Sequence, residues 1–133
     1  GECQEGQVWE AAMSASHFRC DNLLIFIDKN GLQIDGSTDE IMTIDPLKEK
    51  WKSFGWEVFS VDGHNILDIV ATLEQARNVV GKPVVIISNT VKGKGVSFME
   101  HQLCFHGAPC SNDQLIIATK ELDEYRKELT CPN

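Results

Sequence analysis

The sequence predicts an α/β domain with a mostly parallel sheet flanked by helices. Three short apolar segments, at residues 23–27, 56–61 and 83–88, are separated by stretches with helical periodicity. Apolar segments that alternate with amphipathic ones are typical of parallel strands and their crossover helices. The length of 133 residues suits one domain around one core.

The first half of the chain supplies one helix and one strand. A helix is predicted over residues 4–17, where small and branched apolar residues form a stripe on one face. The run Leu23–Ile27 shows no polar alternation before it ends at Asp28. Such a run predicts a strand that is buried on both faces, as in a parallel sheet.

The second half repeats the alternation. Asp45-Pro46 predicts the start of a helix with proline in its first position, and Gly55 predicts its end. A strand over residues 56–61 and a helix over 65–79 follow. The run at 83–88 predicts a third, buried strand, and a charged helix is expected over 112–129.

Three segments are expected to form loops where the strands end, at residues 29–36, 62–65 and 90–111. In parallel sheets, ligands bind beyond the carboxyl ends of the strands. The long, glycine-rich segment 90–111 is of the length that usually has a function. The sequence therefore predicts a binding site built from these loops.

Charge and cysteine content narrow the class of protein. The formal net charge is −8, from 20 acidic and 12 basic residues, which disfavours nucleic acid and anionic lipid as partners. No apolar run approaches the roughly 18 residues of a membrane span. The five cysteines form no C-x-x-C pair, which favours a reducing, cytoplasmic location. The chain begins without Met or a leader peptide, and we interpret it as a fragment.

Two short motifs carry candidate ligands. Gly1 and Gly6 flank a helix start, where backbone N–H groups favour a phosphate, although glycine before a helix is often only a turn. Asn30-Gly31 is a common hairpin dipeptide. Alternatively, the Asn30 side chain and a carbonyl two residues later offer oxygen ligands to Mg²⁺.

The segment 90–111 leaves further alternatives open. Lys92 and Lys94 lie among glycines and are either solvated or available to an anion. His and Cys side chains in this segment offer a compact zinc set, although its spacing matches no C-x₂₋₄-C pattern. Its members are His101, Cys104, His106 and Cys110.

Four segments together resemble transketolases, in the same order and at similar spacing: residues 1–12, 30–36, 90–100 and 106–109. The resemblance covers essentially the whole chain and implies the thiamine-diphosphate-binding fold, with residues 1–133 as a partial diphosphate- and Mg²⁺-binding domain. In this family the metal motif opens with Gly-Asp-Gly and closes with an Asn about thirty residues later. Gly1 matches the last glycine of the opening, and Asn30 matches the closing Asn.

The resemblance also implies roles for individual residues. Gly1 would present its backbone N–H to the cofactor diphosphate, and Lys92 would approach the same group. Asn30, through its side chain, and Leu32, through its carbonyl, would bind Mg²⁺, or Ca²⁺ or Mn²⁺ in its place. His106 would be the active-site histidine.

A further carboxylate is assigned only by the resemblance. It places Glu5 at the subunit contact beside the cofactor, whereas on its own Glu5 is equally well a solvated carboxylate near a helix start. The three tryptophans, Trp9, Trp51 and Trp56, are expected to pack in the core and at interfaces.

The implied function is transfer of a two-carbon ketol unit between sugar phosphates, as in the pentose phosphate pathway. The glutamate that activates thiamine diphosphate comes from a pyrimidine-binding domain or subunit in this family, so a homo- or hetero-oligomer is expected. The preceding Gly-Asp is absent, and we expect the isolated chain to be inactive. The end of the chain, Tyr125–Asn133, resembles the close of the diphosphate-binding chain in split transketolases.

Other functions remain open. A dihydroxyacetone synthase or a deoxyxylulose-phosphate synthase uses the same cofactor, although Gln4-Glu5-Gly6 and the 30–36 loop favour a transketolase over the latter. A non-catalytic cofactor-binding or assembly module is the alternative from a different class.

Overall fold

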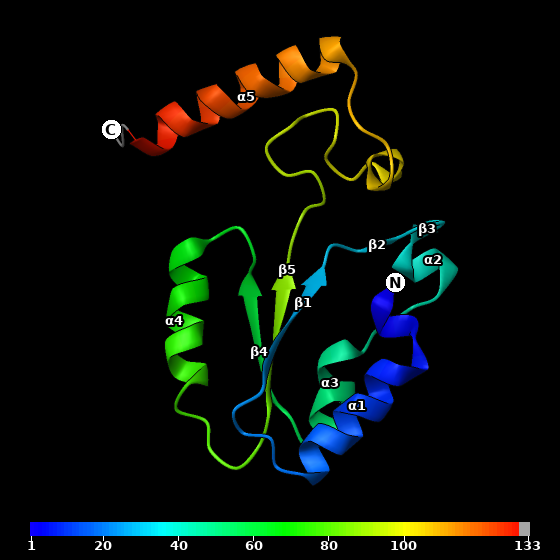
Figure 1. Cartoon of the computed structure of the whole chain (residues 1–133), viewed down its shortest axis with the longest axis vertical. Coiled ribbons are helices and arrows are strands. Elements are labelled where there is room, and N and C mark those ends of the chain that lie inside the picture. Colours follow the sequence, from blue (N-terminus) through cyan, green and yellow to red (C-terminus); the bar gives the residue numbers. More distant parts are fainter. Residues whose placement is uncertain (131–133) are drawn as a thin grey trace. The chain divides into compact units, whose positions relative to one another are not determined.

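A computed structural model describes residues 1–130, and its central feature is a parallel three-stranded sheet. The strand order is β1 (Leu24–Lys29), β5 (Val84–Asn89) and β4 (Glu57–Asp62). Leu24 of β1 and Glu57 of β4 both pair with Val84 of the central strand. The predicted α/β class with a parallel sheet is confirmed (Figure 1).

Helices cover both faces of the sheet. Helices α1 (Gly6–His17) and α3 (Leu47–Ser53) lie on one face, and α4 (Ile66–Ala76) lies on the other (Figure 1). Successive side chains of a strand point to opposite faces. Accordingly, Val85 and Ile87 of β5 belong to the hydrophobic cluster of α1 and α3, whereas Val84 and Ile86 belong to that of α4.

The remaining elements are short, apart from the last helix. They are the 3-10 helix η1 (Glu2–Gln4), the hairpin strands β2 (Leu32–Gln33) and β3 (Gly36–Ser37), α2 (Thr38–Ile41), the 3-10 helix η2 (Leu103–His106) and α5 (Asn112–Thr130).

The three tryptophans pack against one another where α1, α3 and the start of β4 meet, in line with the predicted core packing. The ring centroid of Trp51 lies 5.3 Å from that of Trp9 and 4.8 Å from that of Trp56. Trp56 Nε1 donates a hydrogen bond of 2.9 Å to the Ala12 carbonyl, which fixes α1 against the sheet. These rings therefore pack in the core of the described residues rather than form a binding platform.

The prediction that the first strand is buried on both faces is wrong. Among the described strands, β1 pairs only with β5 and lies at an edge of the sheet. Phe26 is 47% exposed, whereas Ile86, its partner in the ladder, is fully buried. Helix α4 packs against β4 at the opposite edge and leaves the Phe26 side chain uncovered. A continuous apolar run marks a parallel strand but does not distinguish an edge from the centre.

The prediction of a proline in the first helical position is also wrong, by one residue. Helix α3 begins at Leu47, and Pro46, which follows a cis peptide bond, is its N-cap. The capping hydrogen bond is accepted not by Pro46 but by the residue before it: Asp45 Oδ1 accepts from the Leu47 N–H at 3.2 Å. A carboxylate so placed satisfies a free N–H group of the first turn.

The chain divides into two compact units, Gly1–Thr90 and Val91–Asn133, which we describe separately. The first unit contains the sheet, and the second contains the irregular segment 91–111 and α5. Residues 131–133, with Cys131 and the end of the segment Tyr125–Asn133, lie outside the described residues. No helix of the described chain has the length and apolar character needed to cross a membrane.

Candidate functional site

A cavity of about 410 Å³, hereafter the β1 cavity, adjoins β1 and its carboxyl end. Gly1, Asn30 and Leu32 all line it, although Gly1 is far from the other two in sequence. Val8 and Trp51 contribute apolar parts of its wall. The fold therefore brings together three residues that the resemblance assigns to the diphosphate and the metal ion.

The loop that carries Asn30 is shaped by its own hydrogen bonds. Asn30 Oδ1 accepts from the Leu32 N–H at 2.9 Å, and Gly31 between them has φ +75°, which favours glycine. Asn30-Gly31 therefore forms a turn, as one alternative predicted, but not the turn of a hairpin: Leu32 pairs with Ser37 in the β2–β3 hairpin, whose own turn lies at residues 34–35. A carbonyl-type oxygen has two lone pairs, so Asn30 Oδ1 keeps one for a second partner. The turn and metal interpretations are thus compatible.

The chemistry of the donor atoms fits a hard cation. The Asn30 amide oxygen and the Leu32 carbonyl are neutral oxygen ligands of the kind that Mg²⁺ and Ca²⁺ accept. Within residues 1–130, no three His, Cys, Asp or Glu side chains form a group able to hold a metal ion. His101, Cys104, His106 and Cys110, the zinc alternative, accordingly do not form such a group among the described residues.

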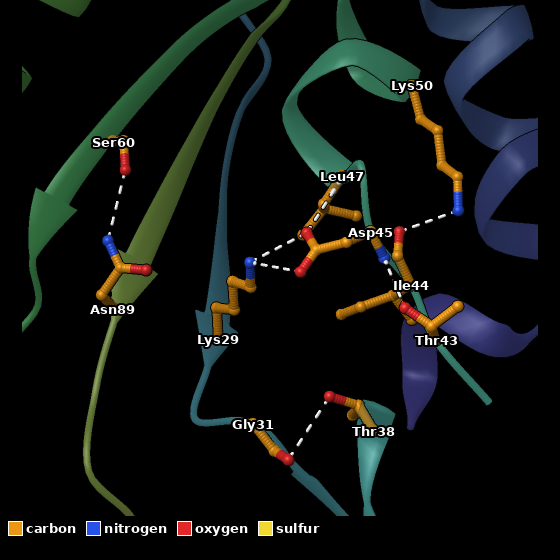
Figure 2. A network of polar contacts seen from close by, with 10 residues as sticks. All are labelled: Lys29, Gly31, Thr38, Thr43, Ile44, Asp45, Leu47, Lys50, Ser60 and Asn89. Atoms are coloured by element: carbon orange, nitrogen blue, oxygen red, sulfur yellow. Dashed lines mark hydrogen bonds and ion pairs between the residues drawn. The ribbon is translucent and has the colours of Figure 1, made fainter. Parts of the chain in front are cut away.

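An ion pair connects the carboxyl end of β1 to the start of α3 (Figure 2). Lys29 Nζ lies 2.9 Å from each carboxylate oxygen of Asp45. The hydrogen bond from Lys29, followed by that from the Leu47 N–H, lowers the pKa of Asp45 below its ordinary value. Lys29 also lines the β1 cavity, so this pair stabilises one part of its wall.

A second set of polar contacts joins the ends of the three strands. Thr90 Oγ1 donates a short hydrogen bond to Asp28 Oδ1. Asn89 Nδ2 donates to Ser60 Oγ at 3.3 Å (Figure 2). The Gly63 N–H donates to the Asn89 carbonyl at 2.9 Å, and a Cβ at Gly63 would overlap the Thr90 methyl group. These contacts hold the carboxyl ends of β1, β5 and β4 together.

Asp28 is a candidate site residue to which the sequence motifs assign no role. Its side chain is exposed and it lines the β1 cavity beside Asn30. The signal that could have identified it is a carboxylate directly at the end of a parallel strand, where ligands bind.

Glu5 lies apart from the residues just described. It is the exposed N-cap of α1, and its side chain accepts no capping hydrogen bond from the first turn. It is not among the residues that line the β1 cavity. Its assignment to a subunit contact beside the cofactor stays a prediction.

Lys92 and His106 belong to the second unit. Lys92 is half-buried, and its carbonyl accepts a hydrogen bond of 3.0 Å from the His101 N–H. Gly93 between them has φ +74°, and a Cβ there would lie 2.5 Å from the Met99 carbonyl oxygen, so only glycine fits. His106 is the exposed last residue of η2. The segment is thus a set of folded turns that presents Lys92 and His106.

The family of the chain follows from comparison with known proteins. The sequence profile described as the thiamine diphosphate binding domain of transketolase matches residues 1–130. The chain belongs to the transketolase family. The resemblance to transketolases that the sequence motifs indicated is therefore confirmed. The roles assigned to individual residues stay predictions.

Relatives within this family include proteins that are named as transketolase subunits. The 6-deoxy-6-sulfo-D-fructose transketolase subunit of Clostridium sp. (strain MSTE9) is 48% identical over 124 residues, which are 93% of this chain and 45% of that protein. An apulose-4-phosphate transketolase subunit of Actinobacillus succinogenes is 44% identical over 124 residues, again 93% of this chain and 45% of that protein. This chain thus spans about half the length of the curated relatives it matches.

Solved transketolases share the fold of this chain. The Campylobacter jejuni enzyme superposes with a TM-score of 0.85 at 31% identity, over 91% of this chain and 19% of that one. A Pichia stipitis transketolase in complex with a sedoheptulose phosphate superposes with a TM-score of 0.80 at 34% identity, over 88% of this chain and 18% of that one. The transketolase fold of the described residues is therefore shown by structure as well as by sequence.

Proposed function

We propose that this chain provides the Mg²⁺–diphosphate part of a thiamine diphosphate site in a two-carbon ketol transferase. In this proposal residues 1–133 form one partial cofactor-binding domain, which acts only with a pyrimidine-binding partner. The observation that carries the proposal is that Gly1, Asn30 and Leu32 line one cavity at the end of a parallel strand. That position is where parallel α/β sheets bind ligands.

Each of the three residues has a distinct role in this proposal. The Gly1 backbone N–H binds a diphosphate oxygen, and the Asn30 side chain and the Leu32 carbonyl bind the metal ion. Because both metal ligands are neutral, affinity for the ion depends on the anionic diphosphate and on carboxylates near it. Asp28 and Glu2 are the two described carboxylates that line the same cavity, and Asp28 lies two residues before Asn30.

The second unit supplies the cation and the proton-transfer group. Lys92 binds the diphosphate as a point charge. His106 holds or moves a proton at the substrate oxygen, which imidazole does near neutral pH. When bound, thiamine diphosphate itself supplies the nucleophilic carbon, and the protein orients and shields it.

The partner follows from the family and from the names of the relatives. The relatives are described as transketolase subunits, which supports a hetero-oligomer in which a second chain contributes the activating glutamate. Among the described cysteines, Cys3, Cys20, Cys104 and Cys110 are free thiols, which supports a reducing, cytoplasmic location. Glu5, exposed at the start of α1, is then available to contact that partner.

The test is calorimetric titration of thiamine diphosphate into the chain together with a pyrimidine-binding transketolase subunit, with Mg²⁺, with Ca²⁺ and with a chelator. Binding that requires the divalent ion supports the proposal. Binding with the same affinity in the chelator would favour a metal-independent assembly module, and absence of binding in all three would overturn the proposal. Turnover is then assayed with the two sugars named for the relatives, 6-deoxy-6-sulfo-D-fructose and apulose-4-phosphate.

A further inference from the structure

The segment that carries Lys92 is attached to α5 by one carboxylate. Glu121 of α5 accepts a hydrogen bond of 2.7 Å from the Ser97 N–H and another of 2.6 Å from the Ser97 hydroxyl. Both carboxylate oxygens are therefore used on a single residue 24 positions earlier in the chain. Hydrogen bonds to an ionised acceptor are stronger than those between neutral groups.

Ser97 lies within a closed set of turns, which transmits the attachment to Lys92. The Lys92 carbonyl accepts from the His101 N–H at 3.0 Å and so closes residues 92–101 into a ring. Inside this ring, Glu100 Oε1 accepts from the Gly95 N–H at 3.1 Å, and Val96, next to Ser97, is buried. Fixing Ser97 against α5 therefore restrains the backbone of Lys92.

The same attachment extends toward His106. Phe98 follows Ser97, and its ring centroid lies 5.6 Å from that of Phe105 in η2. Phe105 immediately precedes His106. The two predicted functional side chains of this unit are thus connected through short contacts to the Ser97–Glu121 pair.

We propose that Glu121 is a positioning residue, which holds the 92–101 ring against α5 and so sets the places of Lys92 and His106. This inference rests on the function proposed above for those two residues. It assigns Glu121 no contact with cofactor or substrate, and its effect passes through Ser97.

The side chains around Glu121 are mostly acidic. Glu100, Glu124, Glu128 and Tyr125 line a hollow of about 340 Å³ with it, and Lys94 faces Glu100 at 3.5 Å. The bond from the Ser97 hydroxyl, followed by that from the Ser97 N–H, lowers the pKa of Glu121 overall, against the opposing effects of desolvation and of the nearby Glu100 carboxylate. Glu121 thus holds both the N–H and the hydroxyl of Ser97 although its neighbours in the hollow are acidic.

The first experiment is hydrogen exchange on the full chain, followed for the amides of residues 93–101. The variants are Glu121→Ala, which removes both acceptors, and Ser97→Ala, which removes only the hydroxyl bond. Glu124→Gln is the matched control, because it removes a carboxylate one turn away that pairs with Lys120 at 3.9 Å and not with Ser97. We expect exchange of these amides to rise at least about tenfold in Glu121→Ala, less in Ser97→Ala and not in the control.

The second experiment uses the partnered enzyme and separates positioning from general stability. We expect Glu121→Ala to weaken thiamine diphosphate binding and lower kcat, each by roughly three- to tenfold, while Ser97→Thr, which keeps the hydroxyl, restores both relative to Ser97→Ala. Unchanged exchange in Glu121→Ala would overturn the inference, and so would faster exchange with unchanged kcat and cofactor affinity. If the parent enzyme binds no cofactor, the proposed function fails and the inference falls with it. The two failures can be told apart, because hydrogen exchange of the amides of residues 93–101 measures the attachment of Ser97 to Glu121 independently of cofactor binding.

Discussion

Lys29 Nζ lies 2.9 Å from both carboxylate oxygens of Asp45, and this pair joins the end of β1 to the start of α3. Asp45 also accepts the hydrogen bond that caps α3 at Leu47. Because Lys29 lines the β1 cavity, one carboxylate serves both the helix start and the cavity wall.

The first prediction concerns the charge of this carboxylate. Asp45→Asn keeps an oxygen for the Leu47 N–H but removes the ion pair, and we expect a loss of about 0.5–1 kcal/mol in the free energy of unfolding at pH 7, since the pair is partly exposed. Urea unfolding measures this loss. Asp39→Asn, which changes an exposed carboxylate of α2, is the control and should leave the free energy of unfolding unchanged.

The second prediction concerns the pH dependence of the same pair. The folded state lowers the pKa of Asp45, so the unfolded chain takes up its proton at higher pH than the folded one does. The stabilisation is therefore complete above the ordinary carboxyl pKa of about 3.9 and is lost as the pH falls through the lowered folded value. The difference between parent and Asp45→Asn should shrink in urea titrations below about pH 4. A difference that grows on acidification would contradict the assignment.

The third prediction tests the metal role of Asn30. In a complete, partnered enzyme, Asn30→Ala should weaken Mg²⁺-dependent cofactor binding at least about tenfold, or roughly 1.4 kcal/mol. Asn30→Asp separates this role from the turn, because it keeps an acceptor for the Leu32 N–H and adds a hard anionic ligand. Calorimetric titration should show weak binding in the first variant and near-parental binding in the second. Unchanged affinity in Asn30→Ala would remove this residue from the metal shell.

The fourth prediction tests His106 as an acid–base group. In the partnered enzyme, His106→Ala should lower kcat by about 10² to 10⁴, with much less change in cofactor affinity. His101→Asn is the control, because this exposed histidine of the same segment has φ 59°, a backbone conformation that Asn tolerates. Steady-state kinetics of the two variants measure the difference, since only His106→Ala should lose turnover. A kcat of His106→Ala within about twofold of the parent would refute the assignment.

The fifth prediction is that this chain alone is catalytically silent. The described residues offer two neutral candidate metal ligands, and the activating glutamate is expected from a partner. Ketol transfer needs both ends of the cofactor to be held at once, because orientation of the reacting carbon is lost otherwise. A coupled assay with a ketose phosphate, an aldose phosphate, thiamine diphosphate and Mg²⁺ would be run with and without a pyrimidine-binding subunit. Clear turnover without that subunit would refute the division of roles between the two chains.

Much of the architecture was predictable because its signals are local. The apolar runs of β4 and β5 and the stripes of α1 and α4 reflect the periods of strands and helices, which a short window of sequence contains. The Asn30–Leu32 turn is likewise local, since its hydrogen bond spans two residues. The family was identified by a resemblance, since four short motifs of this sequence resemble those of transketolases in the same order and at similar spacing.

Only the tertiary structure decided which distant residues meet. It placed β5 at the centre and β1 at the edge, so that Phe26 is exposed although its apolar run resembles that of the buried strand. It also brought Gly1 to Asn30, Lys29 to Asp45 and Ser97 to Glu121. Such pairs depend on how strands order themselves and how helices pack over them. Sequence periodicity predicts neither the strand order nor the helix packing, because it indicates only which face of an element is apolar and not what covers that face.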